Sequence, residues 1–199
     1  MNALKVEPVT LEGTLVRLEP PAENHIADLL VSGQATEIWE YLPFGPFKTA
    51  EEWREAFVRW QEHATAGDSV PFVVIRRDNE RAVGMTAYLD IQADNRGLEI
   101  GGTWLTPALW RTAINTECKY LLLRHAFETL GCIRVQLKTD ARNIRSQRAI
   151  ERLGAVKEGV LRKHMIVKNG IERDTVMYSI TDTEWPAVKA TLEGKLKGQ

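Results

Sequence analysis

The stretch EIGGTWLTPALWRTAINTECK, residues 99–119, combines a strand, a short irregular loop and the start of a helix. The loop runs from Trp110 to Asn115, and the helix carries Thr116 to Lys119. A loop that leads into a helix N-terminus presents N–H groups that lack partners inside the helix, and the helix dipole favours negative charge there. The stretch therefore predicts a site for a pyrophosphate, and so for a nucleotide-bearing cofactor.

A second strand and a second helix follow this stretch and extend the pattern. Asn143 and Ser146 open the second helix, which closes at Gly154. Strands, then a helix, a strand, a helix and a final hairpin predict an α/β (α+β) fold, in which a mixed sheet carries helices on both faces.

The remaining elements are predicted from hydrophobic periodicity and turn residues. They are a strand beginning at 14–18, a helix at 49–65, strands at 72–75 and 83–91, a hairpin of 160–167 and 171–180 around Asn169-Gly170, and a final helix at about 182–197. Thr181 and Glu184 are spaced as a capping box for that last helix. Its apolar side can pack on its own sheet or form a homodimer, and the sequence leaves these alternatives open.

The composition indicates a small enzyme with a sizeable core. The chain has 199 residues, of which 44% are hydrophobic, and we expect one domain over 1–199 with its core at about 14–180. With 26 basic and 27 acidic residues, the balanced charge argues against nucleic acid or a membrane surface as a partner. The sequence shows no leader or long apolar run, and Cys118 and Cys132 lack metal or redox spacing. We therefore expect a cytoplasmic protein.

These motifs resemble those of the GNAT acyltransferases, in particular the RimJ/RimL-type branch that acetylates the N-termini of ribosomal proteins. The residues that carry the resemblance are 99–107, 125–128 with 130–131, 143–146 with 151–155, and 158–162. The likeness extends from about Thr14 to Ile180 and is specific between Glu99 and Arg162. It implies a mostly antiparallel twisted sheet whose central strands, 99–105 and 133–139, splay apart and hold acetyl-CoA in the gap.

The resemblance also implies which residues contact acetyl-CoA. They are Trp104, Leu105, Thr106, Trp110, Arg111, Thr112, Ala113, Ile114, Asn115, Thr116, Asn143, Arg145 and Arg148. In the family, the phosphate loop carries Gln or Arg, then Gly, then Gly or Ala, where this chain has Trp110, Ala113 and Asn115. Asn tolerates the left-handed backbone region that Gly adopts. We therefore expect an altered loop that still binds the cofactor.

Two residues are predicted to be catalytic. Strand alternation places Glu99 on one face with Gly101 and Thr103, where its carboxylate can act as a base for the amine, directly or through water. The resemblance implies that Ser146 donates a proton to the CoA sulfur or orients it. Asn143 could bind the cofactor or cap its helix, and these roles are compatible.

The acceptor is the least determined part of the prediction. An aromatic segment with Trp39, Tyr41 and Phe44 could wall an acceptor pocket or form a hydrophobic plug under the first helices. The four histidines lack zinc-type spacing, so we expect no metal. We expect an N-acetyltransferase that acts on a protein or peptide N-terminal α-amine. The alternatives are acetylation of a small-molecule amine, and a non-catalytic acyl-CoA-binding or interaction protein.

Overall fold

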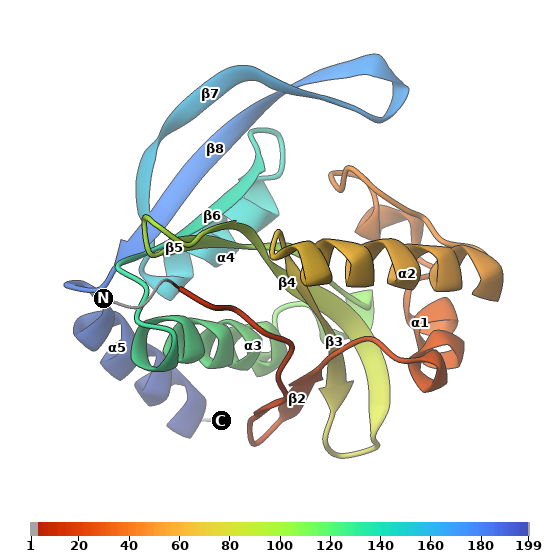
Figure 1. The fold of residues 1–199 in the computed structure, drawn as a ribbon, viewed down its shortest axis with the longest axis horizontal. Coiled ribbons are helices and arrows are strands. Elements are labelled where there is room, and N and C mark those ends of the chain that lie inside the picture. Colours follow the sequence, from red (N-terminus) through yellow and green to blue (C-terminus); the bar gives the residue numbers. More distant parts are fainter. Residues whose placement is uncertain (1–3, 199) are drawn as a thin grey trace.

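A computed structural model describes residues 4–198 (Figure 1). Within this range eight strands form one sheet, in the order β1-β2-β3-β4-β5-β6-β8-β7. The strands are β1 (Leu11–Glu12), β2 (Val16–Glu19), β3 (Val70–Arg76), β4 (Arg81–Gln92), β5 (Gly97–Leu105), β6 (Arg134–Asp140), β7 (Val156–Val167) and β8 (Ile171–Thr181). Neighbouring strands are antiparallel except β5 and β6, which are parallel. The predicted mixed, mostly antiparallel sheet is confirmed.

Helices cover both faces of the sheet (Figure 1). They are α1 (Ile26–Ser32), α2 (Ala50–Ala66), α3 (Ala113–Arg124), α4 (Ile144–Leu153) and α5 (Trp185–Lys197), with short helical turns η1 (Glu23–His25), η2 (Thr36–Ile38), η3 (Pro107–Leu109), η4 (His125–Thr129) and η5 (Lys168–Gly170). The larger core cluster lies between the sheet and α3, α4 and α5. A second cluster, rich in tryptophan, lies between the other face and α1 and α2.

The central strands separate as predicted. β5 and β6 pair only where Gly97–Glu99 lies opposite Arg134–Gln136. Beyond this short ladder each strand keeps its other neighbour, so the gap between them widens toward Leu105 and Asp140.

A β-bulge changes the predicted alternation along β5. Met85 pairs with Trp104 and Ala87 with Gly101, so two β5 residues, Gly102 and Thr103, lie opposite a single residue of β4. Gly102 has φ of +59°, which glycine adopts at little cost. The extra residue turns Thr103 away from the face of Gly101. The prediction that Thr103 shares the face of Glu99 is therefore wrong.

Helix termini follow the local signals closely at two sites. The Thr49 side chain accepts a hydrogen bond from the Glu52 amide at 3.2 Å and begins α2. The Asn143 Oδ1 atom accepts one from the Ser146 amide at 3.0 Å and begins α4. These interactions satisfy backbone donors that helices leave free at their first turn.

Two other helices begin at positions that the sequence did not predict. α3 begins at Ala113, because the Thr112 hydroxyl accepts a hydrogen bond from the Ile114 amide, so Asn115 is already helical. The left-handed residue of this loop is Arg111, with φ of +65°. α5 begins at Trp185 instead of about 182, because the Glu184 carboxylate bonds back to Thr181 from the N-cap position.

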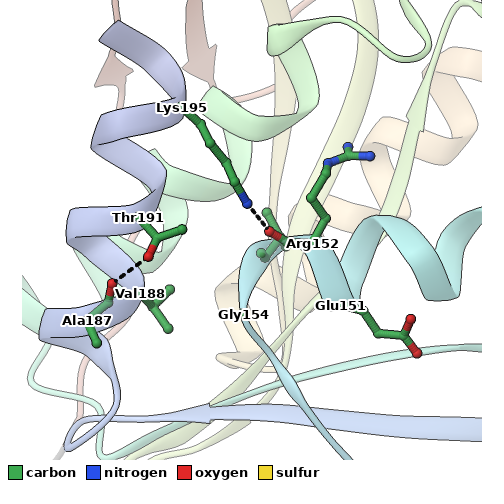
Figure 2. Close-up of a pocket in the computed structure, with 8 residues that line it drawn as sticks. Glu151, Arg152, Gly154, Ala187, Val188, Thr191 and Lys195 are labelled. Atoms are coloured by element: carbon green, nitrogen blue, oxygen red, sulfur yellow. Dashed lines mark hydrogen bonds between the residues drawn. The ribbon is translucent and has the colours of Figure 1, made fainter. Parts of the chain in front are cut away.

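The apolar side of α5 packs within the chain. Trp185, Val188 and Leu192 are buried in the larger core cluster. Lys195 donates a hydrogen bond to the carbonyl oxygen of Arg152, in the last turn of α4 (Figure 2). The apolar side of α5 therefore packs on the core of its own chain, which is one of the two alternatives that the sequence left open. No helix within residues 4–198 is long and apolar enough to cross a bilayer.

A buried carboxylate ties the N-terminal strands to α3. Glu117, which is 5% exposed, accepts hydrogen bonds from the amides of Thr14, Leu15 and Val16 at 2.7–2.9 Å. These three donors lie at the turn that brings β1 against β2. The carboxylate therefore replaces the partners that this turn does not provide.

We expect Glu117→Ala to lower the free energy of unfolding by about 3 kcal/mol, because it removes three charge-assisted bonds and leaves their donors without a protein partner. Urea denaturation would measure this loss. Glu55→Ala, at an exposed ion pair on α2, is the control and should change stability by less than about 1 kcal/mol. Equal effects of the two variants would contradict the assigned role.

Candidate active site

A cleft of about 920 Å³ opens where β5 and β6 separate. Of the residues predicted to form the site, those that line it are Glu99, Trp104, Leu105, Trp110, Arg111, Thr112, Asn115, Asn143, Arg145, Ser146, Arg148, Tyr41 and Phe44. The others, Trp39, Thr106, Ala113, Ile114 and Thr116, do not line it. The cleft thus joins the N-terminus of α3, the N-terminus of α4 and the end of the β5–β6 ladder.

Glu99 lines the cleft at the end of the β5–β6 ladder and is 2% exposed. Its Oε2 atom lies 2.8 Å from Nζ of Lys138, on the neighbouring strand β6. A Cβ atom at Gly101 would lie 2.5 Å from the Oε1 atom of Glu99. The glycine therefore leaves the space that the carboxylate occupies.

Of the backbone amides at Leu105 and Thr106, only that of Leu105 points toward the cleft. The Thr106 amide donates to the Val83 carbonyl at 2.9 Å, so this amide is used within the sheet. Because successive amides of a strand point to opposite edges, the Leu105 amide points toward the gap beside β6.

An aromatic and an arginine side chain meet across the mouth of the cleft. The Arg145 guanidinium of α4 lies 3.6 Å from the centroid of the Trp110 ring, in the loop before α3. The Trp110 Nε1 atom donates to the Leu105 carbonyl at 2.9 Å and fixes the ring against β5. This cation–π contact connects the two sides of the cleft at the loop that is predicted to bind phosphate.

The start of α4 brings two predicted residues to the cleft wall. The Asn143 side chain caps this helix, so the capping role expected of it is confirmed. Ser146 is three residues further on and lines the cleft with Arg145 and Arg148. This part of the cleft therefore combines a hydroxyl group, a helix N-terminus and two guanidinium groups.

The two interpretations of the aromatic segment apply to different residues. Trp39 is 3% exposed and packs against Trp53 and Trp104, with ring centroids 6.5 and 5.1 Å away, as a hydrophobic plug would. Tyr41 and Phe44 instead line the cleft. One segment therefore anchors itself in the core and provides part of the cleft wall.

Lys168, in the turn of the β7–β8 hairpin, holds this segment in place. Its Nζ atom donates to the carbonyl oxygens of Phe44 and Trp39, at 2.5 and 3.4 Å. The hairpin extends beyond the other strands, and its turn reaches toward the segment that precedes α2 (Figure 1). Burial lowers the pKa of Lys168.

A second ion pair lies at the end of β6. The Arg142 guanidinium bonds to both carboxylate oxygens of Asp140, at 2.9 and 2.6 Å, and also lies 5.8 Å from the centroid of the Tyr41 ring. Burial acts to raise the pKa of Asp140, but the hydrogen bonds from Arg142 outweigh it and the pKa is lowered. The pair holds a charged carboxylate at the cleft wall.

Lys119 is a cleft residue that the sequence analysis missed. It is 6% exposed, and its Nζ atom donates to the hydroxyl groups of Thr103 and Thr86. Burial lowers its pKa to about 8, although Cys118 and the negative charge of Glu99 act in the opposite direction. The spacing of Lys119 four residues after Asn115 could have indicated that both face the cleft.

A model of the family "Acetyltransferase (GNAT) domain" matches residues 16–156 of this chain. The chain belongs to the GNAT acetyltransferase family. Among GNAT relatives, a putative ribosomal N-acetyltransferase, YdaF of Bacillus subtilis (strain 168), is 27% identical over 178 residues, which cover 88% of this chain and 94% of that protein. The resemblance predicted from the sequence is confirmed, and the chain is an N-acetyltransferase by class.

Solved GNAT structures share the fold. A putative acetyltransferase from T. thermophilus superposes with a TM-score of 0.87 at 39% identity, and the match covers 96% of this chain and 99% of that one. Mycobacterium smegmatis RimJ, in complex with CoA-disulfide, superposes with a TM-score of 0.81 at 22% identity, over 94% and 95% of the two chains. Within residues 4–198 of this GNAT chain, no group of three His, Cys, Asp or Glu side chains is arranged to hold a metal ion.

The titration of Lys119 gives a test of its environment in this GNAT fold. In the unfolded chain Lys119 has its ordinary pKa of 10.5, and in the folded protein about 8. Between these values the unfolded state binds the proton that the folded state has lost, so stability rises with pH. We expect the stability of the wild type relative to Lys119→Met to increase from about pH 8 toward pH 10.5.

Urea denaturation of both proteins over this pH range would measure the change. Lys157→Met, at an exposed lysine of β7, is the control and should keep a constant difference from the wild type. A constant difference for Lys119→Met would show that burial does not perturb this amine.

Proposed function

We propose that this chain transfers an acetyl group from acetyl-CoA to a primary amine, with the α-amine of a protein or peptide N-terminus as the acceptor. The amine attacks directly in a ternary complex. The observation that carries this proposal is the continuous cleft that runs from the N-terminus of α3 to the buried Glu99 carboxylate. The end at the N-terminus of α3 can bind an anionic acetyl donor, and the end at Glu99 can activate an amine.

The donor end of the cleft fits a CoA thioester. The N-terminus of α3, after its Thr112 cap, reaches the cleft at Thr112 and Asn115, where it can bind a phosphate oxygen. Arg111, Arg145 and Arg148 line the same part of the cleft and can neutralise phosphate charge. The RimJ structure with the same fold contains a CoA derivative, which supports this assignment. When bound, acetyl-CoA supplies an acyl thioester.

Glu99 is the proposed base for the acceptor. Its Oε2 atom lies 2.8 Å from the Lys138 amine and has no hydrogen-bond partner among residues 4–198, and Gly101 leaves space at Oε1. A carboxylate is a weak base, so an α-amine with a pKa near 8 is a better acceptor than a lysine amine with a pKa near 10.4. This difference supports an N-terminal α-amine, as does the name of the YdaF relative.

Ser146 is proposed to act on the leaving thiol, and the Leu105 amide on the developing oxyanion. The hydroxyl group of Ser146 lies in the first turn of α4, on the cleft wall, and can donate a hydrogen bond to sulfur. A backbone donor fixed in a strand stabilises negative charge without reorganisation.

We further propose a cytoplasmic location, which the two buried, unpaired cysteines support.

We expect Glu99→Gln to reduce kcat by about 100-fold while acetyl-CoA still binds, because the amide retains the shape of the carboxylate and cannot accept the proton. Calorimetry would measure binding, expected near −8 kcal/mol for micromolar affinity. Release of the CoA thiol would measure turnover. Glu37→Gln, at an exposed glutamate of η2, is the control. Wild-type turnover by Glu99→Gln would exclude Glu99 as the base.

A panel of acceptors separates the proposed function from its alternatives. We expect peptides with a free N-terminus to be acetylated at the α-amine, and Nα-blocked lysine peptides and polyamines to be poor substrates, as mass spectrometry of the products would show. Preferential acetylation of small amines would favour the small-molecule alternative. Acetyl-CoA binding without turnover of any amine would favour the non-catalytic alternative.

A further inference from the structure

Arg173 is a buried cation in the cleft whose charge the mechanism does not use. It lies on β8 opposite Met165, is 5% exposed, and lines the cleft. Within residues 4–198 its Nε atom is buried without a hydrogen-bond partner. A buried guanidinium without a bound carboxylate is costly, and such groups in native structures usually have a partner.

The strand pairing places Arg173 on the same face of the sheet as the proposed base. Residues 173, 175 and 177 of β8 alternate onto one face, and their β6 neighbours on that face are Asp140 and Lys138. Lys138 forms the ion pair with Glu99. Arg173 and Glu99 therefore face the same part of the cleft, where an acceptor amine would approach.

The charges on this face do not balance. Glu99 is paired with Lys138, and Asp140 is paired with Arg142. Arg173 forms no ion pair within 4 Å among residues 4–198, and the long-range charges of Asp140 and Glu99 only partly offset the burial that lowers its pKa. An arginine stays protonated under such shifts. The side of the cleft formed by Glu99, Lys138, Asp140, Arg142 and Arg173 therefore carries more positive than negative charge.

We propose that Arg173 binds a carboxylate of the acceptor, so that the preferred acceptor is an amine with an anionic group close to its reactive nitrogen. This inference rests on the proposed function. A guanidinium binds a carboxylate through two parallel hydrogen bonds, which would satisfy the free Nε atom. The carboxylate comes from an acidic side chain in the first residues of a peptide, or from the α-carboxylate of a single amino acid. A polyamine would instead place positive charge beside Arg173.

Matched pairs of acceptors test this assignment. One pair is a peptide with glutamate at its second position and the same peptide with glutamine there. The other pair is a free amino acid and its α-amide. We expect kcat/KM to be at least 10-fold higher for the acidic member of one pair, mainly through KM, and that pair identifies the source of the carboxylate. Equal kcat/KM within both pairs would overturn the proposal.

Substitution of Arg173 connects the preference to this side chain. We expect Arg173→Met to reduce the acid-to-neutral ratio to about 1, and Arg173→Lys to restore part of it. Arg162→Met, at an exposed arginine of β7, should keep the wild-type ratio. Retention of the full ratio by Arg173→Met would overturn the assignment. If Arg173→Met does not fold, the acceptor pairs with the wild type and Arg173→Lys still decide.

The experiment separates this inference from the proposed function. Calorimetric titration of the same acceptors, in the presence of the CoA thiol, measures their binding without turnover. If no amine is acetylated, the transferase proposal fails, and the binding ratio within each pair still decides on Arg173. Tighter binding of the acidic member supports the carboxylate site, and equal binding excludes it.

Discussion

One extra residue in β5 determines how the two faces of the sheet are used. At Gly102 and Thr103 the strand contains two residues opposite one, so side chains beyond this point exchange faces. Before the bulge, Ile100 packs toward α3 and Glu99 faces the other side. Beyond it, Thr103 contacts Lys119 of α3, and Trp104 joins the tryptophan-rich cluster under α1 and α2. A regular strand would direct both side chains to the opposite faces.

Several charged groups are buried in the cleft, and ion pairs and hydrogen bonds offset the cost of removing most of them from water. Glu99 and Asp140 each have a cation on β6 or just after it, and the Lys119 amine is bonded to two hydroxyl groups. Burial of a charge destabilises a protein unless hydrogen bonds and opposite charges compensate. Glu99, Asp140 and Lys119 are therefore compensated before a ligand binds, whereas Arg173 has no ion pair among residues 4–198.

The sequence predicted the parts of the fold that depend on neighbouring residues. The cap at Asn143 and the turn at Asn169-Gly170 are local, and each lies where the pattern placed it; the helix predicted over 49–65 is observed over 50–66. The three amides bound by Glu117 lie more than 100 positions away in the chain, and no local pattern shows this contact. The bulge at Gly102 and the positions of Lys119 and Arg173 also depend on pairing between distant strands and helices. Most of the residues predicted for the site thus line one cleft, whereas the buried cations Lys119 and Arg173 in that cleft were not predicted.

The attachment of the aromatic segment depends on main-chain atoms. Lys168 binds the carbonyl oxygens of Trp39 and Phe44, which every amino acid possesses. Tyr41 and Phe44 line the cleft, and Trp39 is buried in the core, where Phe44 packs against it. Residues of the wall can therefore be exchanged during evolution without loss of the attachment. A change of wall residues can thus change the shape of the acceptor that fits the cleft, while the β7–β8 hairpin continues to hold the segment in place.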